Sequence, residues 1–389
     1  MYTIKTLNAI SPVGLAKLPP HLFEVDSDAA EPQGILVRSA DLHDMPLPDS
    51  LLAIARAGAG TNNIPIDKCT AAGIVVFNTP GANANAVKEL VLCGLLLASR
   101  KVAAGMDWAK TLKGQGDQVG KLVEKGKSAF VGPEILGKSL GVVGLGAIGV
   151  LVANAAQKLG MTVYGYDPFL SVDAAWGLSS HICHARSLDE IYANCDYITL
   201  HLPQNNETKG MICAESLAKM KDGVRILNFA RGGLVNSADM IAALESGKAA
   251  AYVTDFPDDA LLCTEGVTAI PHLGASTPES EDNCASMAAD ELKDYLENGN
   301  IRNSVNMPAV SMARQPGLTR ICILHRNMPN TISLFAGAVG AAGVNIENMQ
   351  SMSRGEYAYT LFDVSGEFAD SAVTSLEAME PIIRVRVIR

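Results

Sequence analysis

The sequence predicts an α/β protein whose largest part is a doubly wound parallel sheet. Short apolar runs recur along its middle, with segments of helical periodicity between them. Continuous apolar strands that alternate with helices indicate a parallel sheet covered on both faces. Several of the runs end at polar residues, at the strand ends where open parallel sheets bind ligands. The runs are residues 140–143, 162–166, 197–202, 225–229, 250–254 and 267–270.

Length and composition limit the possible classes. A chain of 389 residues predicts two or three domains. Hydrophobic residues make up 48% and charged residues 19%, which is typical of a folded protein rather than a disordered one. The net charge of -10 disfavours nucleic-acid binding, since phosphate backbones require clustered Lys and Arg. No apolar stretch approaches the ~18 residues of a membrane span, so neither nucleic acid nor membrane is an expected partner.

The cysteine pattern favours a reducing compartment. Eight cysteines are scattered through apolar runs with no CxxC pair, which predicts reduced thiols and a cytoplasmic location. His181, Cys183 and His184 lie close together in the sequence, but no second cluster offers further metal ligands. We therefore expect no metal.

A dinucleotide-binding pattern occupies residues 138–167. Gly144, Gly146 and Gly149 follow an apolar run in GxGxxG spacing, and an amphipathic helical segment comes next. The first glycine permits a tight turn, the second lets the backbone approach a pyrophosphate, and the third allows close packing of helix on strand. Asp167 ends the following strand, where a carboxylate can bind the adenosine ribose. No Arg or Lys directly follows it to hold a 2′-phosphate, so the sequence predicts a Rossmann domain that binds NAD.

Smaller units flank this domain. In the first unit, residues 34–37 and 73–77 resemble strands, while residues 50–56 and 84–99 show helical periodicity. A long helix predicted at 278–297 returns the chain to that unit, which makes a flavodoxin-like α/β substrate domain discontinuous. After a linker at 310–317, the order βαββαβ predicts a small α+β domain with an antiparallel sheet. The expected domains are 1–97 with 284–309, 98–283, and 318–389.

Two side chains at strand ends indicate hydride-transfer chemistry. Arg231 can hold a carboxylate through two parallel hydrogen bonds, and glycines beside it let a ligand approach. His272 follows the last apolar run, and its ordinary pKa suits the proton transfer that accompanies hydride transfer at a carbon bearing oxygen. An acid beside the imidazole would orient it. Asp258 and Asp259 are the candidates.

These motifs together resemble the D-isomer-specific 2-hydroxyacid dehydrogenases over nearly the whole chain. The resemblance rests on RAGAGTNNI from Arg56, NTPGANANAVKEL from Asn78, GLGAIG, NFARGGLVN and PHLGAS. It implies NAD-dependent oxidation of a phosphorylated 2-hydroxy acid, with 3-phospho-D-glycerate as the expected substrate and L-serine synthesis as its purpose. Oxidation of another acid, such as D-lactate or glycerate, and a non-catalytic NAD-responsive binding protein are the alternatives.

The resemblance also implies roles for individual residues. Arg231 would bind the substrate carboxylate and His272 would be the acid/base, paired with Asp259 where relatives usually carry Glu. Arg56, Asn83 and Asn85 would face the substrate from the smaller domain, and Lys125 or Lys127 would hold its phosphate. The implied cofactor residues, in which Asp255 would bind the nicotinamide amide, are Gly144, Gly146, Ala147, Ile148, Gly149, Asp167, Phe229, Ala230, Asp255, His272, Gly274 and Ala275.

The C-terminal unit resembles an ACT domain, a module that binds amino acids between paired copies. His325, Asn327 and Asn345 match positions that hold L-serine in serine-inhibited relatives. Asn330 stands where relatives usually have glycine, and Asn tolerates the left-handed backbone that such a turn needs. The resemblance implies a homodimer or homotetramer with L-serine as a possible effector. A purely oligomerising domain is the alternative.

Overall fold

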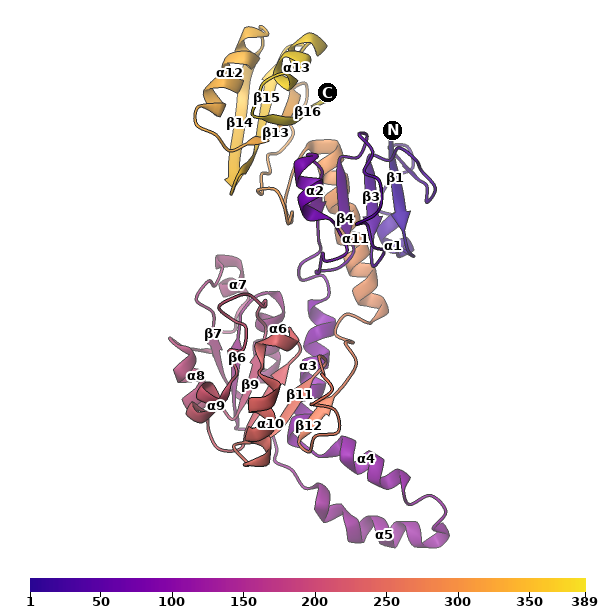
Figure 1. Ribbon diagram of the computed structural model, residues 1–389, viewed down its shortest axis with the longest axis vertical. Coiled ribbons are helices and arrows are strands. Elements are labelled where there is room, and N and C mark those ends of the chain that lie inside the picture. The colour runs from indigo at the N-terminus through magenta and orange to yellow at the C-terminus, as the bar shows by residue number, and fades with distance from the viewer. The chain divides into compact units, whose positions relative to one another are not determined.

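The structure, a computed structural model, describes residues 1–389 and contains two compact units. Unit 1 comprises Met1–Ala82 and Pro278–Arg389, and unit 2 comprises Asn83–Thr277 (Figure 1). The contacts divide the chain at 82/83 and 277/278, while the sequence analysis expected domain boundaries at 97/98 and 283/284. Helix α3 (Ala84–Ser99) belongs to unit 2 because its apolar face packs into that unit's core, and all of helix α11 (Pro278–Asn298) belongs to unit 1.

Unit 1 contains a parallel sheet of five strands in the order β2-β1-β3-β4-β5. This order is that of flavodoxin-like folds, as predicted. Besides α11, the helices in the N-terminal part of unit 1 are α1 (Pro12–Leu15) and α2 (Ile66–Ala71). The strands are β1 (Tyr2–Leu7), β2 (Phe23–Val25), β3 (Gly34–Val37), β4 (Ala53–Arg56) and β5 (Val75–Phe77).

The helix expected at residues 50–56 is wrong, because this segment contains strand β4. Ala53, Ile54 and Ala55 are fully buried, and β4 lies between β3 and β5. A strand buried on both faces has no alternation of polar and apolar residues, so periodicity cannot separate it from a short buried helix.

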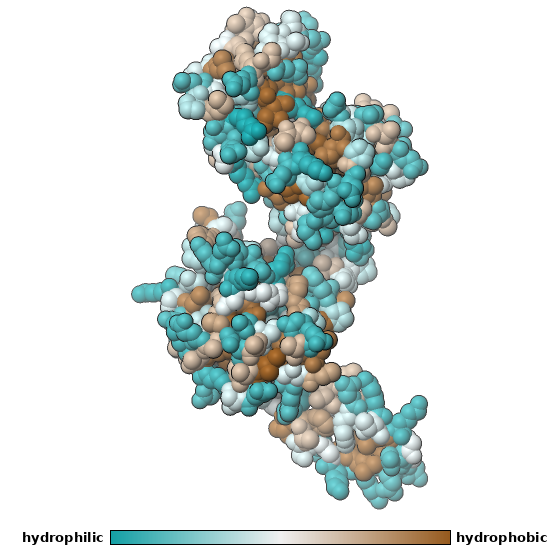
Figure 2. Space-filling model, in the orientation of Figure 1, coloured by the Kyte–Doolittle hydropathy of each residue, from teal (hydrophilic) through white to brown (hydrophobic).

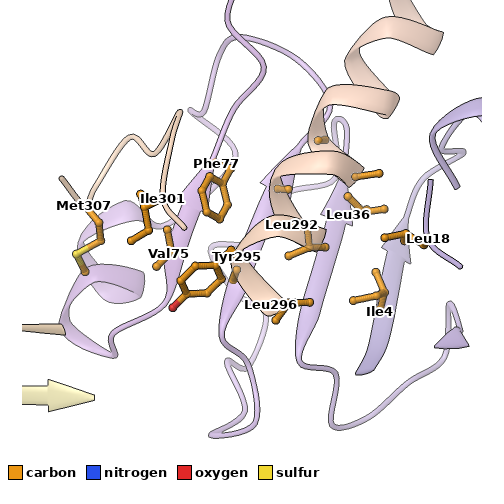
Figure 3. Packing of buried hydrophobic residues seen from close by; sticks show 14 of the residues in the cluster. Ile4, Leu18, Leu36, Val75, Phe77, Leu292, Tyr295, Leu296, Ile301 and Met307 are labelled. Atoms are coloured by element: carbon orange, nitrogen blue, oxygen red, sulfur yellow. The ribbon is translucent and has the colours of Figure 1, made fainter. Parts of the chain in front are cut away.

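Helix α11 covers one face of this sheet. Its residues Leu292, Tyr295 and Leu296 are fully buried, and the Tyr295 ring packs on Phe77 of β5 with ring centroids 5.7 Å apart (Figure 3). Burial of one large apolar side chain contributes about 1.5–3 kcal/mol. The helix is therefore part of the core of unit 1.

The C-terminal part of unit 1 forms the predicted antiparallel sheet, in the order β14-β15-β13-β16. Cys322, Leu324 and Tyr359 face the core that contains α11, whereas Ile321 and Phe362 face two helices on the other side. This period of two buries both faces of the sheet. The elements are β13 (Thr319–Arg326), α12 (Thr331–Ala341), β14 (Asn345–Arg354), β15 (Tyr357–Ser365), α13 (Asp370–Glu377) and β16 (Ile382–Ile388).

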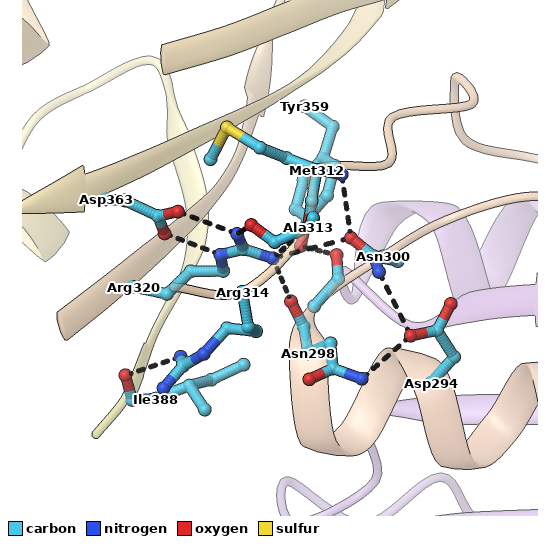
Figure 4. Close-up of polar contacts among 11 residues, drawn as sticks. Asp294, Asn298, Asn300, Met312, Ala313, Arg314, Arg320, Tyr359, Asp363 and Ile388 are labelled. Carbon is cyan, nitrogen blue, oxygen red and sulfur yellow. Dashed lines mark hydrogen bonds and ion pairs between the residues drawn. The ribbon is translucent and has the colours of Figure 1, made fainter. Parts of the chain in front are cut away.

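A buried arginine attaches this sheet to the rest of unit 1. Arg320 is 0% exposed and donates to both oxygens of Asp363, at 2.6 and 2.8 Å (Figure 4). Its remaining N–H groups donate to the carbonyl oxygens of Asn298 (2.8 Å), Met312 (2.7 Å) and Ala313 (3.1 Å). A buried ion pair is tolerated when further hydrogen bonds satisfy it, and removal of one partner costs about 3–5 kcal/mol.

Unit 2 contains the predicted doubly wound sheet, seven parallel strands in the order β12-β11-β10-β9-β6-β7-β8. Helices α3 and α6 contribute to one core cluster, and α8, α9 and α10 to the other. The strands are β6 (Ser139–Val143), β7 (Thr162–Tyr166), β8 (Cys183–His184), β9 (Tyr197–Leu200), β10 (Val224–Asn228), β11 (Ala249–Thr254) and β12 (Val267–Ala269). Besides α3 and a helical arm, the helices of unit 2 are α6 (Ala147–Lys158), α7 (Val172–Gly177), α8 (Leu188–Asn194), α9 (Ala214–Lys219) and α10 (Ser237–Glu245). A 3-10 turn, η3 (Gly232–Leu234), precedes α10.

A helical arm extends away from the sheet of unit 2 (Figure 1). It consists of α4 (Val102–Lys110), η1 (Gly116–Gln118), α5 (Val119–Gly126) and η2 (Lys127–Phe130), and neither α4 nor α5 has a buried residue. Trp108 packs on Phe130 at 5.3 Å between ring centroids, so the two ends of the arm hold together.

The arm leaves large apolar side chains uncovered. Val102, Met106 and Val123 are 48%, 59% and 37% exposed, and Figure 2 shows apolar surface among the hydrophilic residues of this arm. A contiguous exposed apolar patch usually marks an interaction surface. No helix of the protein combines the length and apolar character that a membrane crossing demands.

We expect a second copy of the chain to cover this arm. Met106→Glu places a charge in that surface and should shift the protein to a smaller species, because desolvation of an unpaired charge opposes association. Light scattering coupled to size exclusion measures the mass. Gln118→Glu, an exposed polar position on the same arm, is the matched control. A monomeric wild type, or an unchanged mass for Met106→Glu, would contradict the assignment.

Candidate active site

The GxGxxG turn joins β6 to α6 and requires its glycines. Gly144 has φ +92°, and a Cβ there would lie 2.5 Å from the carbonyl oxygen of His201. A Cβ on Gly149 would overlap the carbonyl oxygen of Gly144. A Cβ on Gly146 would meet no atom within 4 Å, so this position opens to ligand. Helix α6 then begins at Ala147, and its free N–H groups favour an anion.

Asp167 follows β7 and is held against that turn. Its Oδ2 accepts the N–H of Leu145 at 2.8 Å, and its Oδ1 accepts the N–H of Phe169 at 2.8 Å. These bonds fix the carboxylate beside the glycines while its remaining lone pairs stay available. The glycine turn and Asp167 therefore fit the diphosphate and ribose of a dinucleotide.

Three predicted residues meet at the carboxyl edge of the same sheet. Arg231 follows β10, Asp255 follows β11 and His272 follows β12, and these three strands are neighbours. The ring of Phe256 lies 4.5 Å from the His272 ring, and a Cβ on Gly232 would lie 3.2 Å from Phe256. The loops that carry Arg231 and His272 are thus packed on one shared side chain.

Asp255 is the buried acid of this edge. It is 2% exposed, and neither carboxylate oxygen has a hydrogen-bond partner. Burial raises the pKa of Asp255, while the charges of His272 and Arg231 act in the opposite direction. Buried acceptors are normally paired, so these oxygens indicate a donor supplied by a ligand. The carboxamide N–H groups of a nicotinamide fit that requirement.

The remaining predicted cofactor residues lie on the same edge. Ile148 lies in the first turn of α6, and the segment 229–230 directly follows β10. Gly274 is buried, and a Cβ there would lie 3.8 Å from Asp255 Oδ2, whereas Ala275 is exposed. The loop after His272 therefore covers the Asp255 carboxylate.

The two candidate acids for His272 differ in their contacts. Asp258 accepts a hydrogen bond from Ser237 Oγ at 2.5 Å and another from the N–H of Leu261 at 3.0 Å, so both of its oxygens are engaged. Asp259 is exposed and makes no hydrogen bond or ion pair, and His272 is also exposed. Asp259 is therefore the acid of the two whose carboxylate is available.

In unit 1, two arginines follow neighbouring strands. Arg56 ends β4, and Arg38 directly follows β3, whose last residue pairs with Arg56. Burial lowers the pKa of Arg56, the nearby Cys284 opposes this, and the charge of Arg38 lowers it further. Arg38 also pairs with Glu281 at 2.6 Å. Our sequence analysis missed Arg38, although it is a polar residue at a strand end like Arg231.

The glycine-rich loop after Arg56 is braced by the Asn78 turn. Asn78 Nδ2 donates to the carbonyl oxygen of Ala59 at 2.6 Å, and the N–H of Thr79 donates to the carbonyl oxygen of Gly58 at 3.2 Å. Arg56 Nε is buried without a partner, which leaves one of its donors available to a ligand.

Other predicted substrate residues lie elsewhere. Asn83 and Asn85 stand at the start of α3 in unit 2, not with Arg56 in unit 1, because α3 packs into the unit 2 core. The Asn85 amide is engaged by Glu89 and Lys88. The expected phosphate cations, residues 125 and 127, both lie on the helical arm, where the second pairs with Glu124.

The predicted effector residues occupy the C-terminal sheet. His325 is 2% exposed, and burial lowers its pKa. Its two ring nitrogens lie 3.0 Å from Thr360 Oγ1 and 2.8 Å from the carbonyl oxygen of the next residue. Asn327 and Asn345 are exposed. Asn330 has φ +64°, which confirms that this turn adopts the left-handed conformation.

Comparisons with known proteins show which family the chain resembles. Residues 93–274 match the family model "D-isomer specific 2-hydroxyacid dehydrogenase, NAD binding domain". The chain is 35% identical over 268 residues to D-3-phosphoglycerate dehydrogenase of Bacillus subtilis, an alignment that covers 67% of this chain and 48% of the relative. It is 31% identical over 352 residues to the Haemophilus influenzae enzyme of that name, covering 87% and 81%.

Solved structures share the fold. NAD⁺-bound 3-phosphoglycerate dehydrogenase of Entamoeba histolytica superposes with a TM-score of 0.58 and 25% identity, covering 78% of this chain and 98% of the other. The chain spans about half the length of the B. subtilis relative. The match to the H. influenzae relative extends over most of both chains. On these comparisons, the chain belongs to the D-isomer specific 2-hydroxyacid dehydrogenase family, and its unit 2 carries the family's NAD-binding domain.

Proposed function

We propose that the protein oxidises 3-phospho-D-glycerate to 3-phosphohydroxypyruvate with NAD, the first step of L-serine synthesis. The observation that carries the proposal is the convergence of Arg231, Asp255 and His272 on one sheet edge beside a dinucleotide turn. Relatives named D-3-phosphoglycerate dehydrogenase support the choice of substrate. All eight cysteines are free thiols, which favours the cytoplasm as its location.

The side chains divide the work of the reaction. Arg231 holds the substrate carboxylate through its planar fork, which fixes the orientation of the neighbouring C2. His272 accepts the proton of the C2 hydroxyl, and Asp259 stabilises the imidazolium that results. Bound NAD would supply the hydride acceptor. The Asp255 carboxylate, whose oxygens have no partner within the protein, would accept a hydrogen bond from the nicotinamide carboxamide and so orient the ring.

In unit 1, Arg38 and Arg56 are the two cations that we assign to a phosphate group. Arg38 and Arg56 follow paired strands, and the charge of one lowers the pKa of the other. Arg38 also pairs with Glu281 at 2.6 Å, and a dianionic phosphate would compete with that carboxylate for the guanidinium. This local charge offsets the net charge of -10. We therefore prefer Arg38 to the two arm lysines as the phosphate cation.

The C-terminal sheet is the proposed site for an effector and contributes to assembly. Asn327 and Asn345 are exposed but donate to the carbonyl oxygen of Gly355 and to Glu347, so L-serine would have to replace these surface bonds, whereas His325 is satisfied in the interior. We infer a homodimer or homotetramer, supported by the uncovered apolar arm.

Phosphate selectivity tests the substrate assignment. The wild type should form NADH from 3-phospho-D-glycerate far faster than from D-glycerate or D-lactate. Arg38→Met should lower kcat/KM for the phosphorylated acid about tenfold to hundredfold, because a hydrogen bond to a charged group contributes about 1.5–3 kcal/mol. D-Glycerate kinetics should not change, and Lys17→Met, a surface cation of the same unit, is the control. NADH formation from D-lactate alone would support another 2-hydroxy acid, and none from any acid would support a binding protein.

The acid/base assignment predicts a loss confined to turnover. His272→Asn should lower kcat by about 10²–10⁴-fold, as expected for loss of a general base, with NADH affinity unchanged in a fluorescence titration. Asp259→Asn should lower kcat more than the matched variant Asp258→Asn, whose carboxylate serves the turn. Unchanged kcat in His272→Asn would remove the imidazole from the mechanism.

L-Serine binding is tested by calorimetry. Heat should appear on titration of L-serine into the full chain, and NADH formation should fall in parallel. Asn345→Ala should abolish both effects, while Gln350→Ala on the same strand should leave them intact. Absence of heat and of inhibition in the wild type would leave the C-terminal sheet a purely structural role.

A further inference from the structure

A buried amide lies directly under the turn that carries Arg231. Asn228 is the last residue of β10 and is 0% exposed. Its Oδ1 accepts the N–H of Ala230 at 3.2 Å, and its Nδ2 donates to the carbonyl oxygen of Arg231 at 2.9 Å. One side chain therefore holds the backbone on both sides of the Ala230–Arg231 peptide. The backbone position from which the guanidinium projects is fixed by these two bonds.

The same amide reaches the neighbouring strand. Asn228 Nδ2 lies 3.4 Å from the hydroxyl of Tyr252, and Thr254 Oγ1 donates to the carbonyl oxygen of Asn228 at 3.0 Å. Thr254 Oγ1 in turn accepts the N–H of Phe256 at 3.1 Å. Tyr252 and Thr254 are 1% and 0% exposed. Because Thr254 and Phe256 flank Asp255, this buried triad of Asn228, Tyr252 and Thr254 ties the exits of β10 and β11 together.

Filling the space between β10 and β11 with polar side chains has a free-energy cost. A buried polar group costs about 1–3 kcal/mol unless it is hydrogen-bonded, and an apolar side chain would carry no such risk. A satisfied polar network instead permits only the arrangement in which every bond is made. In this protein the network fixes the position of the loop after β10 relative to the loop after β11.

A second amide holds the far end of the turn. Gln204 Oε1 accepts the N–H of Gly233 at 3.1 Å, and the side chain of Gln204 is exposed. The turn from 229 to 233 is therefore hydrogen-bonded on its buried side to Asn228 and on its exposed side to Gln204.

We infer that Asn228 is a positioning residue, which with Tyr252, Thr254 and Gln204 sets the location of Arg231 relative to Asp255. The inference rests on the proposed function, in which Arg231 holds the substrate carboxylate and Asp255 orients the nicotinamide. Hydride transfer requires the reacting carbons at about 3–3.5 Å, and a misplacement of about 1 Å can cost about a hundredfold in rate. The triad therefore controls the distance between hydride donor and acceptor.

Asn228→Asp tests this with little change in shape. The substitution keeps the oxygen that accepts from Ala230 and removes the donor to Arg231 and Tyr252. We expect KM for the 2-hydroxy acid to rise at least tenfold and kcat to fall, while the Kd for NADH stays unchanged. Tyr252→Phe, which removes only the long hydrogen bond at 3.4 Å, should raise KM less than Asn228→Asp does.

Gln204→Ala provides a second test in case Asn228→Asp does not fold. It leaves the buried triad intact and should raise KM about threefold to tenfold without lowering Tm. The Kd of oxalate for the NADH-loaded protein gives a second measure of the carboxylate clamp, and it should rise in parallel with KM in both variants.

The outcomes separate this inference from the proposed function. Wild-type turnover of 3-phospho-D-glycerate, or of another 2-hydroxy acid, tests the function. Oxalate affinity tests the positioning role even if no acid is turned over, because it probes the clamp directly. If both variants keep the KM and the oxalate Kd of the wild type, and Asn228→Asp only lowers Tm, then the triad has a structural role alone. Weaker NADH binding in step with KM would also overturn the inference.

Discussion

The parallel hydrogen-bond ladder of β10, β11 and β12 is the constraint on which the site depends. Neighbouring strands pair in a fixed register, with Asn228 opposite Thr254 and Thr254 opposite Ala269. The three loops that follow therefore begin at one level of the sheet. A slip of one residue would turn each buried side chain to the opposite face and move each loop by more than 3 Å. No side chain contact could restore the site after such a shift.

The same rule explains what the sequence could predict and where it failed. Apolar runs marked six strands of unit 2 and the glycine spacing marked the turn, because both are local requirements of backbone geometry. Strand β4 was missed since a run buried on both faces lacks alternation. Arg38 was missed although it obeys the strand-end rule used for Arg231. The sequence could not show that α3 packs into the core of unit 2, because a helix joins whichever core its apolar face meets, and that depends on tertiary packing.

The roles of polar residues were harder to foresee than the strands. Asp258 and Asp259 are adjacent and chemically identical, yet one is engaged by Ser237 and the other is exposed. Asn228 sits inside a motif that the sequence already singled out, but its value lies in partners 24 and 26 residues away. Asn330 was foreseeable because a left-handed turn is a property of the residue itself. Partnerships across strands, by contrast, exist only in the folded protein.

Arg320 has a consequence for the ancestry and dissection of this chain. The C-terminal sheet shares apolar residues with α11, and its buried guanidinium is satisfied by carbonyl groups of the connecting segment as well as by Asp363. A module joined in this way cannot be exchanged for a homologous one by recombination unless the acceptor side changes with it. Cleavage within residues 310–317 would also cut the segment whose carbonyl groups accept hydrogen bonds from Arg320. The two parts of unit 1, the parallel sheet and the C-terminal sheet, should therefore be inherited together.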